Sequence, residues 1–418
     1  MSRFWETPRK PRFLYGWYIL ASSFIVLFFN SGARNSFGVM FKPMMAELGW
    51  NRGAISLAFF VHMTIFALSL IVVGRLYDRY GPKWIIVIST LLISAGYVLI
   101  SRIGSLTEFY VAYGVLAAAG MGGTSGPLFS ALVSKWFVKW RGLAISVALS
   151  GNCLGQFAII PLFTAFSLKY GWRASNLYLG LIMLVINVPL AFVVFRGDPE
   201  QVGKGPADFQ EKGRPRRKEK LEEGDLSLRE AMRTSSFWFF AMTMFVCGSA
   251  DFFVTTHLIP FVTDHGVSAI TAGNMLAWVG LMSLPGILIA GPVSDMIGNK
   301  IPIALTFLLR VFLFLLILKY QTTLSFYIFS LVFGFTLLIT APLSTTLLGR
   351  LYGFSNIGLI SGFIITIHNL GGGFWTYLGG VIFDRSGNYQ TIFLFSTAMA
   401  LVAFLLTLFI REKRHLRP

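Results

Sequence analysis

Charged residues are scarce in this chain of 418 residues, of which Asp, Glu, Lys and Arg together make up 13%. Because soluble domains carry about a quarter charged residues, this scarcity excludes most water-soluble classes. Acidic residues are the rarer kind, with 18 against 35 basic ones, and the formal net charge is +17. Cysteine is nearly absent: Cys153 and Cys247 both lie in apolar runs, which gives no basis for a disulfide framework.

Apolar residues are abundant and make up 55% of the sequence. A helix needs about 20 predominantly apolar residues to span a bilayer. Twelve segments are long enough, at 15–41, 54–73, 84–103, 107–133, 143–167, 174–195, 235–263, 272–293, 301–318, 324–347, 357–382 and 388–410. The sequence therefore predicts an all-α membrane protein with 12 transmembrane helices in the lipid bilayer.

The longest polar interval, 196–234, separates six spans from six and contains a basic run at 214–220. We therefore expect an N-terminal six-helix bundle at 1–195, a linker loop, and a C-terminal six-helix bundle at 235–418. Most Lys and Arg lie in the linker, at the termini and in loops after even-numbered spans, and loops of this kind face the cytoplasm. This predicts a plasma (cell inner) membrane protein with both termini cytoplasmic. The basic surplus then indicates attraction to anionic lipid and no nucleic-acid partner.

An internal repeat supports the division into halves. The segment 74–83 follows span 2, and the similar segment 291–300 follows span 8. Nearly the same offset relates 169–173, after span 5, to 385–389, after span 11. A constant offset along the chain indicates two duplicated six-helix halves.

The repeated loop carries the pattern Gly-x-x-x-Asp-Arg-x-Gly at Gly74, Asp78, Arg79 and Gly81. This pattern resembles the loop motif of the major facilitator superfamily. The resemblance implies the major facilitator fold, two pseudo-symmetric six-helix bundles that rock about a central site. We expect these four residues, and Asp295 in the second copy, to act in the conformational change and not in substrate binding.

A second motif gives a narrower resemblance. The segment 136–144, continuing to Ala148 and Gly151, resembles the signature of monocarboxylate transporters, with departures at Trp136, Trp140, Ser146 and Ser150. The chain is similar to bacterial-type relatives in or near that branch, which borders the oxalate/formate-type exchangers. The resemblance implies a small organic anion as substrate, such as lactate or pyruvate.

Ionisable side chains inside spans cost about 2.5–3.5 kcal/mol on insertion scales and indicate function. Arg34 in span 1 shares a face with Asn30 and Gly38, and a guanidinium binds a carboxylate through two parallel hydrogen bonds. The resemblance aligns Arg34 with a span 1 lysine implicated in substrate and proton handling. We therefore expect Arg34 and Asn30 to bind substrate. The alternative for Arg34 is a salt bridge that packs helices.

Asp251 in span 7 is the only acidic residue in the interior of a predicted span, since Glu108 lies at the very start of 107–133. Spans 1 and 7 are equivalent in the two halves, so Asp251 lies at a depth similar to that of Arg34. We expect the two residues to pair without substrate. An entering carboxylate would compete for Arg34, and Asp251 would then take up a proton. The alternative for Asp251 is a purely structural counter-ion.

Three histidines lie within spans. His257 is six residues beyond Asp251 and so on another face of the helix; it is a second candidate for proton coupling, with an outer gate or packing as alternatives. His368 in span 11 occupies a position where the resemblance allows an acidic residue, and we expect it to bind substrate or carry a proton. His62 in span 2 is expected to be a satisfied interior histidine.

One departure weakens the resemblance. Monocarboxylate transporters place an Asp and an Arg in span 8, where this sequence has Gly280 and Leu284. Either Arg34 has taken over the binding of the anion, or the substrate differs. Arg310 in span 9 is the remaining charge in the interior of a span, but spans 3, 6, 9 and 12 are expected outside the central cavity.

Other classes fit poorly. The sequence lacks paired carboxylates, a nucleophile with its base, a metal-ligand cluster and a phosphate-binding loop, so we expect no enzyme, cofactor, metal or ATP-driven pump. The sequence predicts a monomeric secondary active transporter that carries a monocarboxylate together with a proton by alternating access. The alternatives are a proton-independent organic anion exchanger, whose counterflow ignores pH, and an exporter of apolar compounds, for which Arg34 is dispensable.

Overall fold

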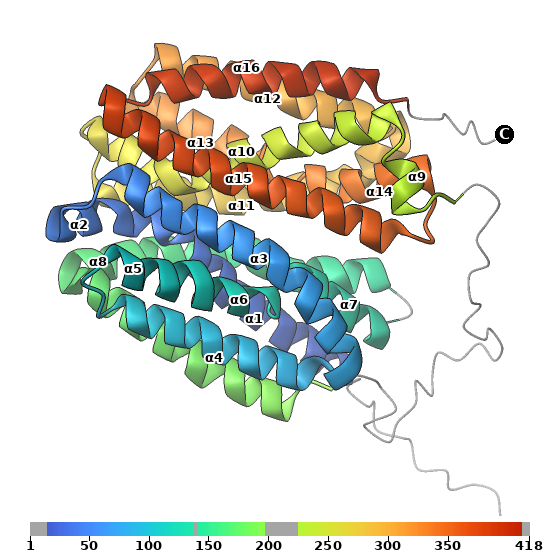
Figure 1. Cartoon of the computed structure of the whole chain (residues 1–418), viewed down its shortest axis with the longest axis horizontal. Coiled ribbons are helices and arrows are strands. Elements are labelled where there is room, and N and C mark those ends of the chain that lie inside the picture. The colour runs from blue at the N-terminus through green and yellow to red at the C-terminus, as the bar shows by residue number, and fades with distance from the viewer. Residues whose placement is uncertain (1–14, 138–139, 197–224, 412–418) are drawn as a thin grey trace, which may run out of the picture.

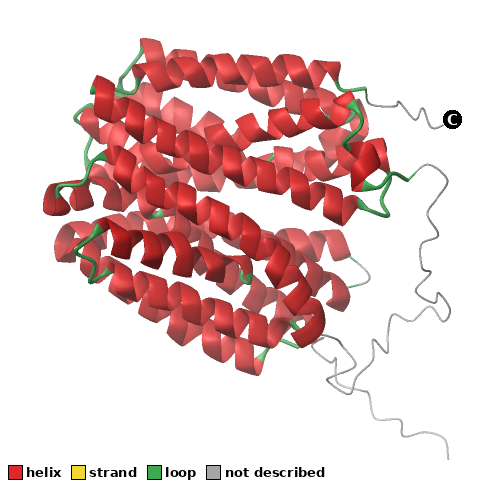
Figure 2. Cartoon of the chain, in the orientation of Figure 1, coloured by secondary structure: helices red, strands yellow, loops and turns green. Residues whose placement is uncertain are grey.

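The computed structural model describes residues 15–137, 140–196 and 225–411. Every regular element in these ranges is a helix (Figure 2). The all-α fold class predicted from the long apolar runs is therefore confirmed.

The helices follow one another in two series, shown in Figure 1. The first comprises α1 (Tyr15–Asn35), α2 (Phe37–Leu48), α3 (Arg52–Tyr80), α4 (Pro82–Ile100), α5 (Leu106–Phe109), η1 (Tyr110–Ala117), α6 (Ala118–Gly122), α7 (Gly126–Trp136) and α8 (Arg141–Val193). The second comprises α9 (Leu228–Ala231), α10 (Ser235–Asp264), α11 (Ala269–Ile297), α12 (Lys300–Lys319), α13 (Thr323–Leu337), α14 (Thr340–Tyr352), α15 (Ile357–Ser386) and α16 (Gln390–Phe409).

Eleven helical runs among the described residues are long and apolar enough to cross a membrane. One of them, Arg141–Val193, contains two spans, because Gly171 interrupts it with φ 83° and ψ 159°. Glycine adopts this backbone conformation without the steric cost that a side chain would bring. The helices of the structure thus match the predicted twelve spans.

Several spans are interrupted near their middle. Span 1 is broken at Ser36, between α1 and α2, and span 4 contains the π-helical segment η1 and a break at 123–125. Span 10 is broken between α13 and α14. Non-helical backbone at membrane depth is tolerated where protein surrounds it, and π-helical turns occur frequently at functional sites. The interruptions therefore mark the interior of the bundle as the place to look for a site.

The spans of the first series lie together, and α10–α16 form a second group beside them (Figure 1). We call these the first and second helix groups. The helix order brings Tyr15, Arg196, Asp225 and Arg411 to one end of the bundle, the linker end. The opposite end, the far end, carries the connections near Gly49, Gly104, Gly266 and Gly387.

Contacts between the groups run through α3 with α15, α8 with α11, and α2 with α10. They are close: a Cβ added to Gly38 would lie 2.7 Å from the carbonyl oxygen of Thr256, and one added to Gly273 would lie 2.7 Å from Thr164 Oγ1. Near the linker end, Gly74 on α3 and Gly362 on α15 have open space instead. The groups are therefore packed together at the far end and separated at the linker end.

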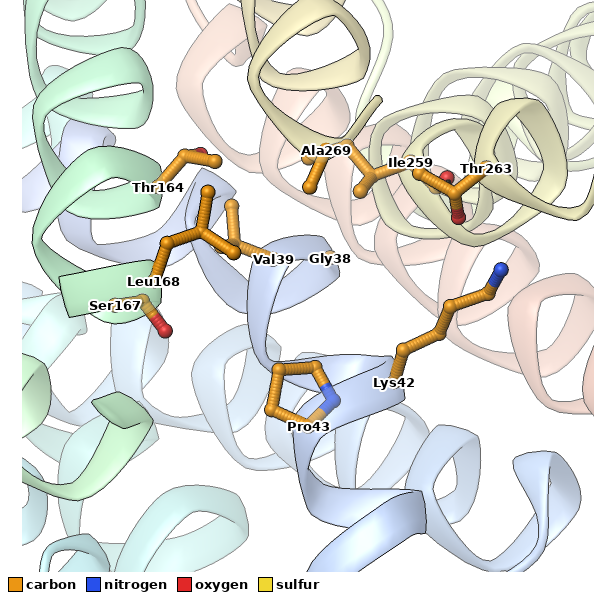
Figure 3. A pocket seen from close by; sticks show the side chains of 10 residues that line it. All are labelled: Gly38, Val39, Lys42, Pro43, Thr164, Ser167, Leu168, Ile259, Thr263 and Ala269. Carbon is orange, nitrogen blue, oxygen red and sulfur yellow. Dashed lines mark hydrogen bonds between the residues drawn. The ribbon is translucent and has the colours of Figure 1, made fainter. Parts of the chain in front are cut away.

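A small pocket of about 60 Å³ remains between the groups near the far end (Figure 3). Apolar side chains such as Val39 and Ile259 line it, with Lys42 at its edge. Pockets that hold small molecules measure about 300–1,000 Å³, so this one is a packing defect in the closed end and not a substrate site.

The predicted linker and loop motif fall at the linker end. Residues 197–224 of the linker lie outside the described residues, and 225–234 contain α9, which begins with a capping box between Ser227 and Glu230. Asp78 and Asp295 are exposed at the ends of α3 and α11. This places the motif where the groups are separated, and its role in the conformational change stays a prediction.

Candidate functional site

Three groups of polar side chains inside the bundle contain ionisable residues. The Arg34 site consists of Arg34, His62, Tyr97 and Tyr113; the Asp251 cluster of Cys247, Asp251, Arg310 and His368; and the far-end latch of Lys42, Arg52, Asp264, Asp384 and Tyr389, with His257 beneath it.

Arg34 lies in the last turn of α1, just before the interruption at Ser36. Its side chain is partly buried, and its guanidinium lies 5.8 Å from the centre of the Phe252 ring. Among the described residues it has no ion pair or hydrogen bond with another side chain. A helix-packing salt bridge, one alternative for Arg34, is therefore wrong in this conformation. The guanidinium is available to a ligand.

Three buried side chains lie within electrostatic reach of Arg34, namely His62, Tyr97 and Tyr113. His62 Nδ1 lies 2.8 Å from the carbonyl oxygen of Tyr113, and the two rings stack at 4.4 Å. His62 Nε2 and both phenol oxygens have no partner in the described part of the chain. A buried polar group without a partner costs about 1–3 kcal/mol and calls for an explanation. His62 is interior as predicted, but only half satisfied.

Asn30, the other residue of span 1 expected to bind substrate, lies one turn before Arg34. Its Nδ2 donates a hydrogen bond to the carbonyl oxygen of Thr124 at 3.2 Å, where span 4 is broken. Its Oδ1 has no partner among the described residues. One half of the amide therefore stabilises a helix break, and the role of the other half in binding stays a prediction.

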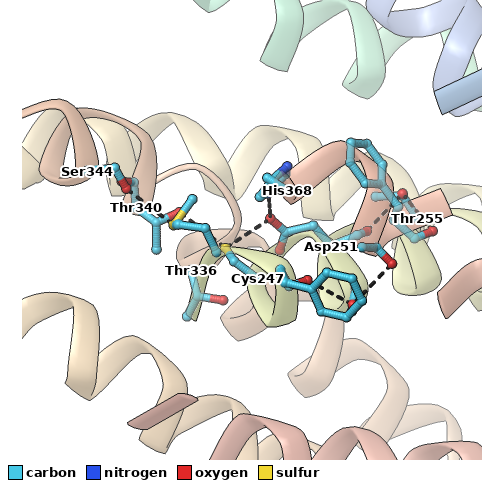
Figure 4. A network of polar contacts seen from close by, with 12 residues as sticks. Cys247, Asp251, Thr255, Thr336, Thr340, Ser344 and His368 are labelled. Carbon is cyan, nitrogen blue, oxygen red and sulfur yellow. Dashed lines mark hydrogen bonds and ion pairs between the residues drawn. The ribbon is translucent and has the colours of Figure 1, made fainter. Parts of the chain in front are cut away.

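Asp251 lies on α10, where Figure 4 shows its carboxylate beside His368. It is also paired with Arg310 on α12. Its Oδ1 is 2.8 Å from Arg310 Nη2, and its Oδ2 is 3.3 Å from His368 Nε2. The expected pair between Arg34 and Asp251 is therefore wrong for this conformation. The reason is that Arg310, on α12 of the same helix group, extends into the interior of that group and neutralises Asp251.

Arg310 is fully buried and has two roles. Besides neutralising Asp251, its Nε donates to Thr336 Oγ1 at 3.1 Å and its Nη2 to the Thr336 carbonyl oxygen at 3.0 Å. Thr336 lies in the last turn of α13, just before the break in span 10. Span 9 was expected outside the central cavity, and no role was expected for Arg310. Its long side chain carries the charge inward to Asp251 and also satisfies backbone at a broken helix.

His368 on α15 is the most exposed ionisable member of the Asp251 cluster, with 19% of its side chain exposed against 9% for Asp251 and none for Arg310. The Phe252 ring lies 5.5 Å from the His368 ring, edge to face, and 5.8 Å from the Arg34 guanidinium. One aromatic side chain therefore neighbours both Arg34 and the Asp251 cluster.

The Asp251 cluster contains donor types that zinc prefers. Atoms of Cys247, Asp251 and His368 lie within 4.8 Å of one another. The guanidinium of Arg310 is 2.8 Å from the carboxylate and 3.8 Å from the sulfur, so a cation is already present. A divalent metal would face that positive charge at close range. The guanidinium therefore disfavours a metal ion at this cluster.

His257 lies under the far-end latch and not in the Asp251 cluster. Its Nδ1 is 2.8 Å from the Tyr389 hydroxyl, and its Nε2 is 2.9 Å from the carbonyl oxygen of Thr376. Both ring nitrogens are thus engaged. This position favours the outer gate among the alternatives for His257, and its role in proton coupling stays a prediction.

The far-end latch joins the two helix groups and was not found in the sequence. Arg52 donates to the Tyr389 hydroxyl at 2.8 Å and lies 2.8 Å from Asp264 Oδ2, while Lys42 lies 2.7 Å from Asp264 Oδ1. Asp384 accepts a hydrogen bond from the backbone N–H of Arg52 at 3.0 Å. One sequence feature could have indicated the latch. Asp264 and Asp384 lie at the ends of spans 7 and 11, on the side of the membrane whose loops carry few charges.

The charged side chains of the far end and of the interior have different partners. The far end is held closed by ion pairs, and the interior contains one guanidinium with no carboxylate partner among the described residues and one neutralised carboxylate beside a histidine. Such an interior can accept an anion and a proton together, since their charges cancel.

Comparison with known proteins gives the family. The family model of the Major Facilitator Superfamily matches residues 23–376 and 250–418. The uncharacterized MFS-type transporter YcxA of Bacillus subtilis is 25% identical over 90% of this chain and 90% of its own length. Monocarboxylate transporter 13 of Bos taurus is 24% identical over 93% of this chain and 87% of its own. The oxalate:formate antiporter of Oxalobacter formigenes is 24% identical over 94% and 91%.

Solved structures share the fold. A bacterial homologue of the human lysosomal transporter Spinster, in an inward-facing and occupied conformation, superposes with a TM-score of 0.73 at 14% identity and covers 95% of this chain and 97% of its own. A mutant of the nucleoside transporter NupG gives 0.74 at 12% identity, covering 95% and 99%. With the family model, the helical architecture and the interior site in agreement, the chain belongs to the Major Facilitator Superfamily of multi-pass membrane transporters.

Proposed function

We propose that this transporter carries a small organic anion, a monocarboxylate such as lactate or pyruvate, together with a proton by alternating access. The observation that carries the proposal is the Arg34 guanidinium, which lies in the interior of the bundle without a carboxylate partner among the described residues. The names of two relatives, a monocarboxylate transporter and an oxalate:formate antiporter, agree with an organic anion.

An unpaired guanidinium away from bulk water is costly, and a ligand carboxylate removes much of that cost. The planar fork of Arg34 can bind a carboxylate through two parallel hydrogen bonds. An uncharged apolar ligand would leave the charge unpaired. The site therefore favours an anion over the apolar compounds of the exporter alternative.

The proton is assigned to Asp251 and His368 together. Because Arg310 already neutralises Asp251, a proton placed on His368 3.3 Å away gives the cluster a net positive charge. That charge is stabilised by an anion at Arg34, whose guanidinium neighbours the same Phe252 ring as His368 does. The two ligands then favour each other's binding, which is a thermodynamic coupling of the kind that symport needs.

The two helix groups act as the moving bodies, with residues 1–195 and 235–418 as the two bundles and the loop motif at the linker end. In the plasma (cell inner) membrane, with the termini in the cytoplasm, the packed far end faces outward. The structure then corresponds to an inward-facing state, in which the anion leaves or enters from the cytoplasm.

Uptake into proteoliposomes tests the proposal. Acidifying the outside should raise the uptake of labelled lactate. Arg34→Gln should abolish both uptake and counterflow, and Arg34→Lys, which keeps the charge but loses the bidentate geometry, should retain part of them. Transport by Arg34→Gln at the wild-type rate would refute the central claim.

The coupling is tested separately with Asp251→Asn. Counterflow exchange should persist in this variant, while accumulation driven by a proton gradient should disappear. If wild-type counterflow and accumulation are both indifferent to pH, the protein is an anion exchanger without a proton, the class to which the relative from Oxalobacter formigenes belongs by name.

A further inference from the structure

Two cations of the first helix group lie beside the same exposed aromatic residue at the linker end. Lys83 is the second residue of α4, and its Nζ lies 4.8 Å from the centre of the Phe192 ring. Arg196 lies just after the end of α8, and its Nη1 donates to the carbonyl oxygen of Phe192 at 3.2 Å. Neither cation has a carboxylate partner among the described residues. The two positive charges repel each other, and an anion beside both removes that repulsion.

The guanidinium of Arg196 is held in place and keeps one edge free. Its Nη1 donates to the carbonyl oxygens of Phe192 at 3.2 Å and of Phe195 at 3.4 Å. The Tyr15 hydroxyl donates to the neighbouring carbonyl oxygen of Val194 at 2.7 Å and joins the start of α1 to the same place. A guanidinium has five N–H donors, and the edge formed by Nε and Nη2 has no hydrogen bond in the described part of the chain. This edge matches two oxygens of a phosphate group.

Lys83 is positioned by aromatic rings on the outer surface of the first helix group. Its Nζ also lies 5.6 Å from the Trp84 ring, and the Trp84 and Phe192 rings meet edge to face at 5.7 Å. Because an aromatic face attracts a cation, the two rings restrict where the ammonium group can lie. Trp84 is 51% exposed and Phe192 is 40% exposed. An exposed tryptophan beside a lysine at the end of a span is typical of the level of the lipid headgroups.

An uncovered apolar face extends from these rings toward the far end. α4 and the part of α8 after Gly171 lie at the edge of the first helix group that is away from the second (Figure 1). They pack closely, since a Cβ added to Gly180 would lie 3.0 Å from the carbonyl oxygen of Ser94. Their exposed apolar side chains form two stripes at helical spacing, Trp84, Ile88 and Leu91 on α4 and Ile182, Val185 and Phe192 on α8. In a multi-pass membrane protein such a face contacts acyl chains.

We propose that Lys83 and Arg196 bind the phosphate of an anionic phospholipid whose acyl chains lie along the stripes of α4 and α8. The free edge of Arg196 donates two hydrogen bonds to the phosphate, and the ammonium of Lys83 adds a further charge-assisted contact. A zwitterionic lipid brings a positive group toward these cations, whereas phosphatidylglycerol does not. Because both helices belong to the first group, the lipid stays bound while the groups rock, and its binding is independent of the anion at Arg34.

Lipid titration of the purified, delipidated full-length protein tests the inference. Mixed micelles that contain dioleoylphosphatidylglycerol should raise the melting temperature more than micelles that contain dioleoylphosphatidylcholine. A basic residue near an anionic surface contributes about fivefold in affinity, so Lys83→Gln and Arg196→Gln should each bind phosphatidylglycerol about fivefold more weakly. Arg196→Lys should lose part of the affinity, since it keeps the charge but not the planar fork.

Two control variants separate a specific site from the general attraction of a basic protein to anionic lipid. Lys169→Gln and Lys319→Gln remove the same charge at the far end, each from a lysine beside an exposed tyrosine, Tyr170 or Tyr320. Both should bind phosphatidylglycerol like the wild type. Arg34→Gln should do so too, because the transported anion takes no part in binding the lipid.

Three results would overturn the inference. Equal weakening by Lys83→Gln and Lys169→Gln would show general electrostatics in place of a site. Full affinity in both Lys83→Gln and Arg196→Gln would remove the residues assigned to it. If inorganic phosphate at the same ionic strength raises the melting temperature as much as phosphatidylglycerol, the site binds a soluble anion and the acyl chains have no role. None of these results bears on the proposed function, which is tested by the transport activity of Arg34→Gln.

Discussion

At the scale of single residues, the ion pair between Asp251 and Arg310 sets the electrostatics of the second helix group. The two charges are 2.8 Å apart and both side chains are buried. Such a pair gains little net stability over a neutral one, but removing one partner leaves the other as an uncompensated buried charge. Removing one charge of the pair should therefore lower the stability of the protein much more than removing both.

Arg310→Met should destabilise the protein by about 3–5 kcal/mol, because Asp251 loses its counter-ion in the interior. Adding Asp251→Asn to the same chain should restore most of this loss, since no charge then remains unpaired. Thermal unfolding of the purified variants measures both effects. A double variant as unstable as Arg310→Met alone would mean that the hydrogen bonds from Arg310 to Thr336, and not its charge, stabilise the fold.

The sequence was sufficient to find the ionisable residues of the interior, but not to predict which of them form pairs. Arg34, Asp251, Arg310 and His368 stand out because charged and titratable groups are rare in apolar spans. Which of them pair depends on how each helix is rotated and on how far a long side chain reaches, and neither follows from spacing along the chain. Tyr97 was missed because a tyrosine in an apolar helix is common.

At the scale of helices, glycines decide how closely the spans approach. A Cβ added to Gly248 on α10 would press against the carbonyl oxygen of His368 on α15. Gly362, also on α15, has no atom within 4 Å of the corresponding position. Small residues at such interfaces allow backbones to come close in a membrane. The contact between α10 and α15 also positions His368 against Asp251.

Gly248→Ala should push α10 away from α15, lower the melting temperature and weaken proton-driven accumulation. Gly362→Ala is the matched control: it should leave the melting temperature unchanged or raise it slightly, since alanine favours a helix over glycine by about 0.5–1 kcal/mol. Both are measured by thermal unfolding and lactate uptake. Equal behaviour of the two variants would contradict the role given to the close contact.

The number and order of the spans could be predicted from the sequence because each needs a long apolar run, and a bilayer imposes its thickness on every one of them. The interruptions could not be located in this way. Ser36 and the segment Tyr110–Ala117 lie inside the predicted spans 15–41 and 107–133, and the backbone there is irregular because of its tertiary surroundings. These irregular places are also where the Arg34 site is built.

At the scale of the whole molecule, the two helix groups meet at the far end and separate at the linker end. The internal repeat predicted two halves, but a repeat carries no information about which end is closed. The latch supplies that information, since Lys42 and Arg52 of the first group contact Asp264 and Asp384 of the second. Charge pairs of this kind break when the groups rotate apart.

Asp264→Asn should weaken the latch and populate a state that is open at the far end. Ile259→Cys, in the pocket of Figure 3 and 5% exposed, reports on this opening through its rate of reaction with a maleimide. The rate should rise severalfold when Asp264→Asn is added. Glu47→Gln is the control, because Glu47 pairs with Arg173 at the same end but within the first group. A similar rise with Glu47→Gln would show a general loosening and not a latch.

Orientation in the membrane is tested with two exposed positions at opposite ends. Thr107→Cys lies at the far end and Met296→Cys at the linker end, and both native cysteines are buried. A membrane-impermeant maleimide added to intact cells should label Thr107→Cys and spare Met296→Cys, because the basic linker end is expected inside. The reverse pattern would place the termini outside and invert the assignment of the inward-facing state.

The latch also bears on the origin of the two halves. Its cations, Lys42 and Arg52, come from one repeat, and its acids, Asp264 and Asp384, come from the other. The repeat offset places Glu47 of the first repeat at the position of Asp264 in the second, whereas Ile259 and Ala269 of the second repeat stand at the positions of Lys42 and Arg52. The acidic side of the latch thus has a counterpart in both repeats, but its cations occur in the first repeat alone, so a second copy of the other repeat could not supply them.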